Sequence, residues 1–312
     1  MSIQKAVNDP ATNDEMTNDN NIKKMILIVD SGSTKSDWAL IDETGKKLDE
    51  FETMGLNPYF HSPDVTEKAI RGNESLMAIA SKVKHIFFYG AGSSTKEMCS
   101  IMHAGLSRVF ANAEIRIDHD QLGSAMAAYD GEPCIACILG TGSNSCYFDG
   151  KHVTEVIPSL AFILGDEASG SYYGKILLQE YFYKQLPEDL RKSFEEKYAP
   201  TKDEIINKIY REPNANVYLA SFMKFIGEHH DHPHVQNWVT KGMIHFINIH
   251  VKCFPQYKEV PAHFIGSVSH YFADCLQKAA QETGIRLGRI IHKPIDALVA
   301  YHVRYKLPAL VS

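Results

Sequence analysis

The chain has 312 residues, of which 44% are hydrophobic and 22% are charged, and its formal net charge is −6. These values are ordinary for a globular protein and exclude fibrous and largely disordered classes, while the length favours two domains over one. A negative chain offers no basic surface to a phosphodiester backbone, so nucleic acid is not expected as a partner.

The first segment of the chain, residues 1–24, is rich in Asn, Asp and Thr and shows no apolar period. This composition predicts a disordered tail. The tail has no apolar run of the kind that signal peptides carry. No segment approaches the roughly 18 to 20 apolar residues needed to cross a bilayer. We therefore expect a cytoplasmic protein without a membrane partner.

Three strands are expected after the tail. The run MILIVD at 25–30 is short, continuous and apolar, which is typical of a buried strand. The small polar loop SGSTK follows it. SDWALID at 36–42 and KLDEF at 47–51 are then read as strands on either side of the turn ETGK. Short strands joined by tight turns indicate an antiparallel meander.

The same arrangement recurs near the start of the second half of the chain. CIACIL at 134–139 is a buried strand, GTGSN is a second small polar loop, and SCYF at 145–148 and HVTEV at 152–156 are the next strands. This repeat predicts two related domains that face each other across a cleft. Ligand sites commonly form at such domain interfaces.

The remaining segments alternate between helices and strands, which predicts an α/β architecture. Further helices are expected at 65–80, 96–111, 168–185, 201–210, 217–228, 234–252, 267–283 and 296–307, and one more begins close to Gln121. Further strands are expected at 85–90, 114–118, 262–266 and 289–293.

Two loops are candidates for phosphate binding. The first, SGSTK, lacks the glycine spacing of a Walker A motif. A hairpin of small residues can still present backbone N–H groups to an anion, although a single loop of this kind is more often an ordinary turn. The second loop, GTGSN, stands at the matching place in the other half, and a pair of such hairpins suggests a clamp on a polyphosphate. The candidate residues are Gly32, Ser33, Thr34, Lys35, Gly140, Thr141 and Gly142.

Two aspartates stand at the ends of expected strands. Asp30 adjoins the first loop, where a carboxylate suits a water of a bound Mg²⁺; the alternative is an Asp that caps the turn. Asp120 precedes an expected helix, and its ordinary role there is an N-cap. At the mouth of a cleft, Asp120 would instead accept the proton of an attacking hydroxyl, which phosphoryl transfer to an alcohol needs.

Two later segments also combine glycine with polar residues. In LGDEASGSYYG, Asp166 and Glu167 would bind sugar hydroxyls or an ion, or would cap the following helix. In IGSVS, Gly266 and Ser267 join a strand to a helix, where a nucleotide can approach the backbone, although one Gly-Ser pair is weak evidence.

The cysteines and a histidine cluster are further candidates for metal ligands. The pair Cys134 and Cys137 has C-x-x-C spacing, but residues i and i+3 of a strand point to opposite faces, so we read all six cysteines as free thiols. The stretch HHDHPH at 229–234 suggests zinc. A polar connector broken by proline is the simpler interpretation.

In this order, the segments DSGSTKSDW, DHDQLGSA, GTGSN, LGDEASG and IGSVS resemble the N-acetylglucosamine kinase-like branch of the actin-like sugar kinases, the BadF/BadG/BcrA/BcrD ATPase family. The resemblance covers 25–310. It implies two ribonuclease-H-like α/β domains with a central cleft, formed by 25–131 with 294–312 and by 132–293. It also implies ATP and Mg²⁺ as cofactors and hinge closure.

The activity implied by the resemblance is ATP-dependent phosphorylation of an amino sugar of the N-acetylglucosamine type. The partners would be that sugar and ATP, with homodimerisation left open. The implied roles are a base at Asp120, metal binding near Asp30, phosphate binding by both loops, and adenosine binding at Gly266 and Ser267. The implied sugar-binding residues are Asn57, Thr141, Asn144 and Asp166.

The sequence departs from this family at one place in the sugar pocket. Animal-type relatives carry G-G-W-G before G-D-E, whereas this chain has SLAFIL at 159–164. The identity of the sugar is therefore open. The alternatives to a kinase are an ATP-driven activator of a radical dehydratase or reductase, which would hold an iron–sulfur cluster through cysteines, and a nucleotide or sugar sensor without catalysis.

Overall fold

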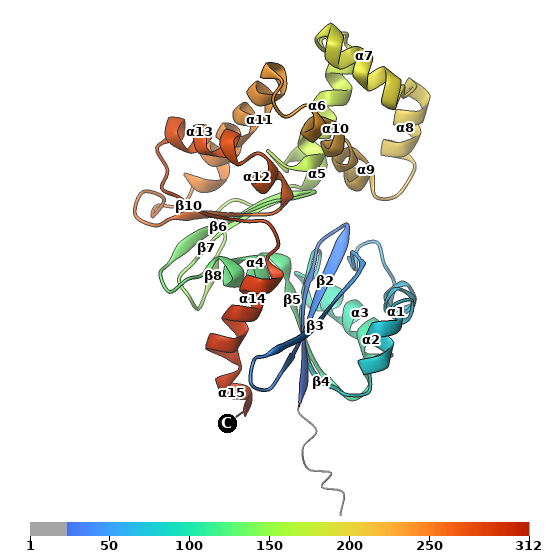
Figure 1. Cartoon of the computed structure of the whole chain (residues 1–312), viewed down its shortest axis with the longest axis vertical. Coiled ribbons are helices and arrows are strands. Elements are labelled where there is room, and N and C mark those ends of the chain that lie inside the picture. The colour runs from blue at the N-terminus through green and yellow to red at the C-terminus, as the bar shows by residue number, and fades with distance from the viewer. Residues whose placement is uncertain (1–23, 312) are drawn as a thin grey trace, which may run out of the picture.

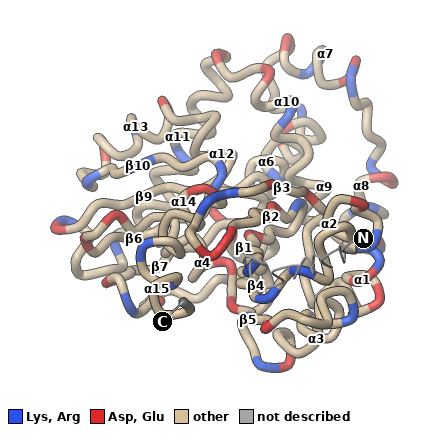
Figure 2. The backbone as a smooth tube through the Cα atoms, turned by 60° about the horizontal axis from the view of Figure 1, so that its bottom comes forward, with Lys and Arg blue, Asp and Glu red and all other residues tan. Residues whose placement is uncertain are grey.

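A computed structural model describes residues 24–311 of the chain, so the predicted tail lies outside the described residues except for Lys24. These residues form two lobes, each built on one mixed sheet (Figure 1). Lys and Arg are interspersed with Asp and Glu along both lobes (Figure 2). None of the described helices is long and apolar enough to span a membrane.

The sheet of the first lobe has the strand order β3-β2-β1-β4-β5. β1 pairs antiparallel with β2 and parallel with β4; β2–β3 is antiparallel and β4–β5 is parallel. The strands are β1 (Met25–Ser31), β2 (Lys35–Asp42), β3 (Lys47–Met54), β4 (Val83–Gly90) and β5 (Glu114–His119).

The sheet of the second lobe repeats this topology. Its order is β8-β7-β6-β9-β10, with two antiparallel pairs on one side of β6 and two parallel pairs on the other. The duplication predicted from the two meanders is confirmed. The strands are β6 (Cys134–Leu139), β7 (Ser143–Phe148), β8 (Val153–Thr154), β9 (Ala262–Ile265) and β10 (Leu287–Ile291).

Alternate side chains of the first strand belong to different cores, as the two-residue period of a strand requires. Leu27 and Val29 pack with the helices α1 (Pro63–Arg71), α2 (Glu74–Ile79) and α3 (Lys96–Ser107) on the outer face. Ile26 and Ile28 face a core shared with the second lobe. Both faces of this sheet are therefore covered.

The shared core joins the lobes through α4 (Asp120–Ala128) and α14 (Ile295–Tyr301), which contact each other. Residues from both sheets belong to it, including Ile28 of β1 and Ala136 of β6. Small side chains let α4 approach closely: a Cβ on Gly123 would lie 2.7 Å from the Tyr89 Cβ. α14 also contacts β1 and β2, so this late helix packs against the first lobe (Figure 1).

Helices account for most of the second lobe (Figure 1). They are α5 (Ala161–Leu164), α6 (Gly170–Phe182), α7 (Glu188–Lys197), α8 (Lys202–Tyr210), α9 (Ala215–Ser221), α10 (Met223–Glu228), α11 (Pro233–Phe246), α12 (Ser267–Tyr271) and α13 (Ala273–Thr283). The π-helical turn η1 (Ile247–Val251) extends α11, and η2 (His302–Lys306) and α15 (Pro308–Val311) follow α14.

Some predicted helices differ from those observed. The helix expected at 65–80 is two helices, because Asn73 interrupts it and caps α2 by accepting the Leu76 N–H. The helix expected at 267–283 is likewise divided, at Phe272. α7 was not predicted; it is very polar and buries Leu190 and Phe194.

Candidate active site

The two candidate carboxylates come from the same edge of the first sheet. Asp30 is the penultimate residue of β1, and Asp120 follows directly after β5. The register places Ser31 beside Gly90, and Gly90 beside His119. The carboxyl ends of these parallel strands therefore lie in line, which is where open α/β sheets bind ligands.

The first hairpin is tightly folded and backed by β3. The Gly32 N–H donates to the Lys35 carbonyl at 2.9 Å, and the Gly55 N–H donates to the Thr34 carbonyl at 3.0 Å. A Cβ on Gly55 would lie 2.4 Å from the Gly32 carbonyl oxygen. Below the hairpin, the buried Ser31 and Ser36 hydroxyl oxygens lie 2.7 Å apart. The hairpin is thus held in one shape before any ligand binds.

The second hairpin is held by the start of α6. The Gly170 N–H donates to the Gly140 carbonyl at 2.8 Å, and the Ser171 N–H donates to the Thr141 carbonyl at 3.1 Å. Within the hairpin, the Gly140 N–H donates to the Gly142 carbonyl. The carbonyls of Gly140 and Thr141 therefore face α6.

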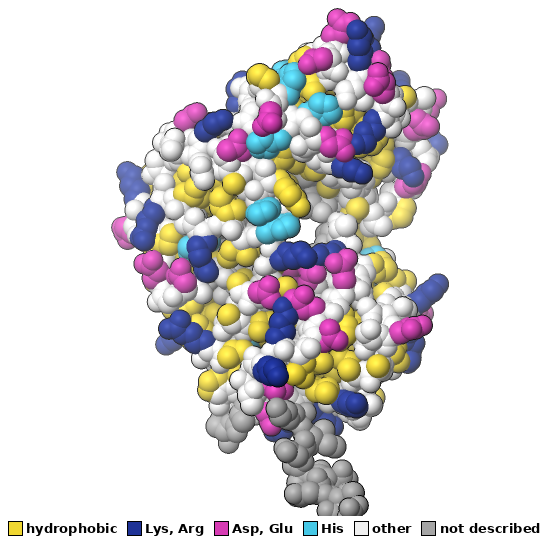
Figure 3. All heavy atoms as spheres, in the orientation of Figure 1, with side chains coloured by type: hydrophobic (Ala, Val, Ile, Leu, Met, Phe, Trp, Pro, Cys, Tyr) yellow, Lys and Arg dark blue, Asp and Glu magenta, His cyan; other side chains and the backbone are white. Residues whose placement is uncertain are grey.

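The two hairpins meet across the lobes. The hydroxyl oxygens of Thr34 and Thr141 lie 3.1 Å apart, although 107 residues separate them in the sequence. On the face drawn in Figure 3, a notch is hollowed between the two lobes. The convergence of the two loops that their sequences predict is therefore present in the structure.

Asp30 and Asp120 are close enough for their charges to interact. Burial, followed by the charges of Asp120 and Asp37, raises the pKa of Asp30 to about 7. Burial also raises the pKa of Asp120, although its carboxylate accepts the Gln121 N–H at 2.9 Å. His119, not Asp120, is the N-cap of α4. Asp120 therefore does not occupy the N-cap position, although its carboxylate accepts one N–H of the first turn.

Lys35 is paired with carboxylates of its own sheet. Its Nζ lies 2.9 Å from Asp37 and 3.1 Å from Glu52. All three side chains are partly exposed, so these pairs contribute little to stability. Lys35 would have to exchange them for a phosphate to act as predicted.

The expected sugar-binding residues lie on both lobes. Asn57 is buried, and its side chain accepts the Tyr59 N–H at 3.0 Å, an Asx turn. Asp166 Oδ1 accepts the Ser143 N–H at 3.2 Å, so it lies against the second hairpin. Asn144, in that hairpin, accepts the Ser145 N–H. Asp166 and Asn144 are thus brought together with the loop, and Asn57 lies beside Gly92 on the first lobe.

Gly266 also lies against the second hairpin. It has a φ of +121°, and a Cβ there would lie 2.4 Å from the Leu139 carbonyl oxygen, so only glycine fits without displacement. Ser267 begins α12. Beyond it, the rings of His270 and His292 stack with centroids 4.2 Å apart. These residues form the wall of the second lobe beside the loop.

We compared the chain with known proteins. No family model matches it, and no curated protein matches it in sequence. Among solved structures, the "Putative N-acetylglucosamine Kinase" of Porphyromonas gingivalis is 36% identical, with a TM-score of 0.84 over 90% of this chain and 99% of that one. The chain belongs to the N-acetylglucosamine kinase-like branch of the actin-like sugar kinases.

Less similar solved structures share the fold. A "Putative N-acetylglucosamine Kinase" of Chromobacterium violaceum is 16% identical, with a TM-score of 0.69 over 90% of this chain and 99% of that one. A ROK family glucokinase of Streptomyces griseus, solved with glucose and AMPPNP, is 14% identical, with a TM-score of 0.55 over 89% and 97% of the chains. Two actin-like domains are thus the architecture of this sugar kinase family member.

The segment SLAFIL at 159–164, which stands in place of the G-G-W-G of animal-type relatives, contains α5 (Ala161–Leu164). Its apolar side chains are uncovered: Leu160, Ile163 and Leu164 are 54%, 72% and 74% exposed. Leu164 is two residues from Asp166. An open apolar surface therefore adjoins the expected sugar position.

Sequence reasoning missed one polar group at this site. His250 is 5% exposed, and its Nε2 lies 2.9 Å from Glu167 Oε2. The sequence pattern indicates Glu167 as a candidate but not His250. Its position within a long apolar helical segment gave no signal, because its partner is 83 residues away.

The cysteines and histidines weighed as metal ligands lie elsewhere. Cys137 and Cys134 belong to different cores, as the strand period predicts, and burial raises the pKa of Cys134 to about 12. His230, His232 and His234 pair with four different carboxylates and share none of them. Within residues 24–311, no three His, Cys, Asp or Glu side chains form a metal-binding group.

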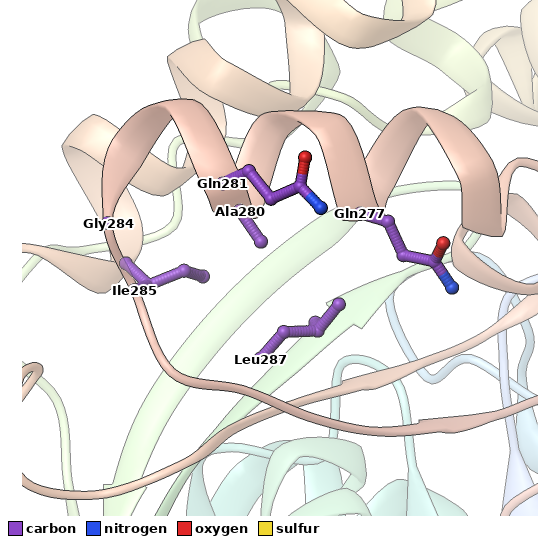
Figure 4. Close-up of a pocket in the computed structure, with 6 residues that line it drawn as sticks. All are labelled: Gln277, Ala280, Gln281, Gly284, Ile285 and Leu287. Atoms are coloured by element: carbon purple, nitrogen blue, oxygen red, sulfur yellow. The ribbon is translucent and has the colours of Figure 1, made fainter.

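The described residues also line an open hollow of about 360 Å³ between α13 and β10 (Figure 4). Its lining residues are Gln277, Ala280, Gln281, Gly284, Ile285 and Leu287. This lining offers two amides and no acid, base or nucleophile. The candidate carboxylates Asp30 and Asp120 lie elsewhere, at the carboxyl end of the first sheet.

Proposed function

We propose that this protein transfers the γ-phosphoryl group of ATP to a hydroxyl of an amino sugar of the N-acetylglucosamine type. The observation that carries the proposal is the contact of the Thr34 and Thr141 hydroxyls, because it brings both hairpins to one place beside the two carboxylates. The 36% identical relative carries the name of such a kinase. A cytoplasmic location fits these substrates.

The hairpins would bind the phosphates through their backbone N–H groups. Gly32 and Gly140 keep side chains away from an approaching anion. Ser33, Thr34 and Thr141 add hydroxyl donors. Gly266 and Ser267 would support the adenosine, beside the stacked rings of the second lobe. Lys35 and Gly142 are the remaining residues that we propose to contact the phosphates.

The donor set near Asp30 fits Mg²⁺, which uses one or two carboxylates together with waters and substrate phosphates rather than a protein cage. Asp30 would hold such an ion through water. When bound, Mg²⁺ supplies charge neutralisation at the phosphates. The pKa of Asp30 is raised by burial and by neighbouring carboxylates, and a bound cation would offset both effects.

Asp120 is the proposed general base. In the transfer, the sugar oxygen bonds to the γ-phosphorus, the bond from phosphorus to the ADP oxygen breaks, and the hydroxyl proton passes to Asp120. A raised pKa makes Asp120 a better proton acceptor than an ordinary carboxylate. Asn57, Thr141, Asn144 and Asp166 would hold the sugar.

The test is ADP formation with glucosamine, N-acetylglucosamine, N-acetylmuramic acid and glucose. We expect turnover with an amino sugar and a loss of about 10²- to 10⁴-fold in kcat for Asp120→Asn, with ATP binding retained. Asp118→Asn, which alters a half-exposed carboxylate two residues away, is the matched control. Turnover by Asp120→Asn within a few-fold of the parent would remove the base assignment, and no turnover with any sugar would remove the function.

A further inference from the structure

The loop before α6 has an unusual backbone. Asp166 and Ala168 have φ values of +57° each, in the left-handed region, although neither is glycine. Residues with a Cβ avoid this region, and they remain in it where the surroundings hold them there. Something must therefore fix the loop on either side of Glu167.

Glu167, between those two residues, is tied to His250. The Glu167 Oε2 and His250 Nε2 atoms are 2.9 Å apart, and both side chains are largely buried, at 16% and 7% exposure. Burial is the largest influence and raises the pKa of Glu167, but the hydrogen bonds from His250 and from a backbone N–H, together with the neighbouring imidazoles, lower the pKa overall. His250 is thus one of the groups that favour the charged carboxylate.

His250 is itself fixed in place. It lies in the π-helical turn η1, a distortion that is frequent at functional sites. Its ring stacks on Phe246 at 4.9 Å, and its carbonyl accepts the Ser145 hydroxyl at 2.6 Å. Its Nδ1 is buried and has no hydrogen-bond partner among the described residues. The hydrogen-bonding ability of the ring is therefore directed at Glu167.

The same network reaches both sides of the site. Asp166, next to Glu167, accepts the Ser143 N–H. The Gln121 side-chain amide donates to the Ser145 carbonyl at 2.7 Å, and Gln121 is the neighbour of Asp120. A Cβ on Gly142 would lie 3.0 Å from Asp166 Oδ2, so the Asp166 carboxylate lies close to the backbone of the second hairpin.

We propose that His250 is a positioning residue of the sugar site: by donating to Glu167 it holds the left-handed backbone at Asp166 and directs that carboxylate at the second hairpin. The proposal rests on the proposed function for the sugar-binding role of Asp166. His250 itself touches neither the reacting atoms nor the phosphates.

The test compares three variants by steady-state kinetics. His250→Leu removes the N–H donor and fills its place with an apolar side chain. We expect the KM for the sugar to rise about tenfold or more, with the KM for ATP unchanged. His250→Gln retains an N–H donor near the Nε2 position and should restore most of the affinity. His234→Leu is the matched control, because His234 pairs with Glu180 at 2.8 Å in the same lobe, away from the hairpins.

A purely structural role predicts another result: His250→Leu and His234→Leu would both lower the thermal midpoint and leave the sugar KM alone. That outcome, or an equal rise in both KM values, would overturn the proposal. A crystal structure of His250→Leu gives a readout without turnover, in which Asp166 should leave the left-handed region. If Asp166 and Ala168 keep positive φ values, the inference is wrong even where the kinase activity is established. If the parent protein phosphorylates none of the sugars but the loop conformation still changes in His250→Leu, the proposed kinase function is refuted and the role of His250 in holding the loop is retained.

Discussion

The buried charge of Asp30 makes a prediction that separates stability from function. The pKa of Asp30 is raised from 3.8 to about 7. Because the folded state favours the neutral acid, the stabilising contribution is fully present below about pH 4 and is lost as the pH rises through about 7. The variant Asp30→Asn cannot ionise and should escape this loss.

The size of the effect follows from the pKa difference. About three units correspond to about 4 kcal/mol in the free energy of unfolding. Roughly 2 kcal/mol of this arises between about pH 5.5 and about pH 8, where most other carboxylates are already charged. Solvent reaches part of Asp30, so these are upper values. The difference is nevertheless large compared with the effect of an ordinary surface substitution.

Urea denaturation of the unliganded protein, followed by the fluorescence of the buried Trp38 in the first lobe and Trp238 in the second, measures this difference. Relative to the parent, Asp30→Asn should gain stability between the two pH values and should lose sugar-dependent ADP formation. Asp37→Asn is a graded comparison: Asp37 faces Asp30 in the strand register and its charge helps to raise the Asp30 pKa, so its pH-dependent gain should be smaller than that of Asp30→Asn. An advantage of Asp30→Asn that is equal at both pH values would refute the reasoning.

Two further predictions concern the hairpins. Lys35→Met removes two partly exposed ion pairs, so the free energy of unfolding should fall by less than about 1 kcal/mol, whereas the KM for ATP should rise; an unchanged KM for ATP would limit Lys35 to its salt bridges. Gly266→Ala places a Cβ against the Leu139 carbonyl at a φ of +121°, so urea denaturation should show a loss of at least about 2 kcal/mol. A parental urea midpoint for Gly266→Ala would contradict the close approach.

The repeated fold could be predicted from the sequence because its signals are local. Each meander is marked by a continuous apolar strand, a small polar loop and a glycine turn within a short stretch. The positions of Asp30 and Asp120 at strand ends follow from the same signals, and so do the two hairpins. The strand period also placed Cys134 and Cys137 on opposite faces, as observed.

The parts that were missed depend on weak or distant signals. The interruption at Asn73 had a local signal, since Gly-Asn often ends a helix, but the apolar pattern on either side concealed it. α7 buries two side chains, too few for a clear apolar stripe. The pairing of His250 with Glu167 joins residues 83 apart, and no local pattern encodes such a contact.

The unfavourable features of this protein are themselves evidence for where it works. Two carboxylates with raised pKa values lie on the first lobe, and a loop with two left-handed non-glycine residues lies on the second. Each feature costs stability, and folding alone gives no reason to keep any of them. Asp30 adjoins the first hairpin, Asp120 ends a neighbouring strand of the same sheet, and Asp166 contacts the second hairpin, whereas the left-handed residues Lys184, Ala199 and Asn214 lie elsewhere in the second lobe. Violations of local rules that converge from two lobes on one place are expected of a binding site whose charge and strain are relieved by its ligands.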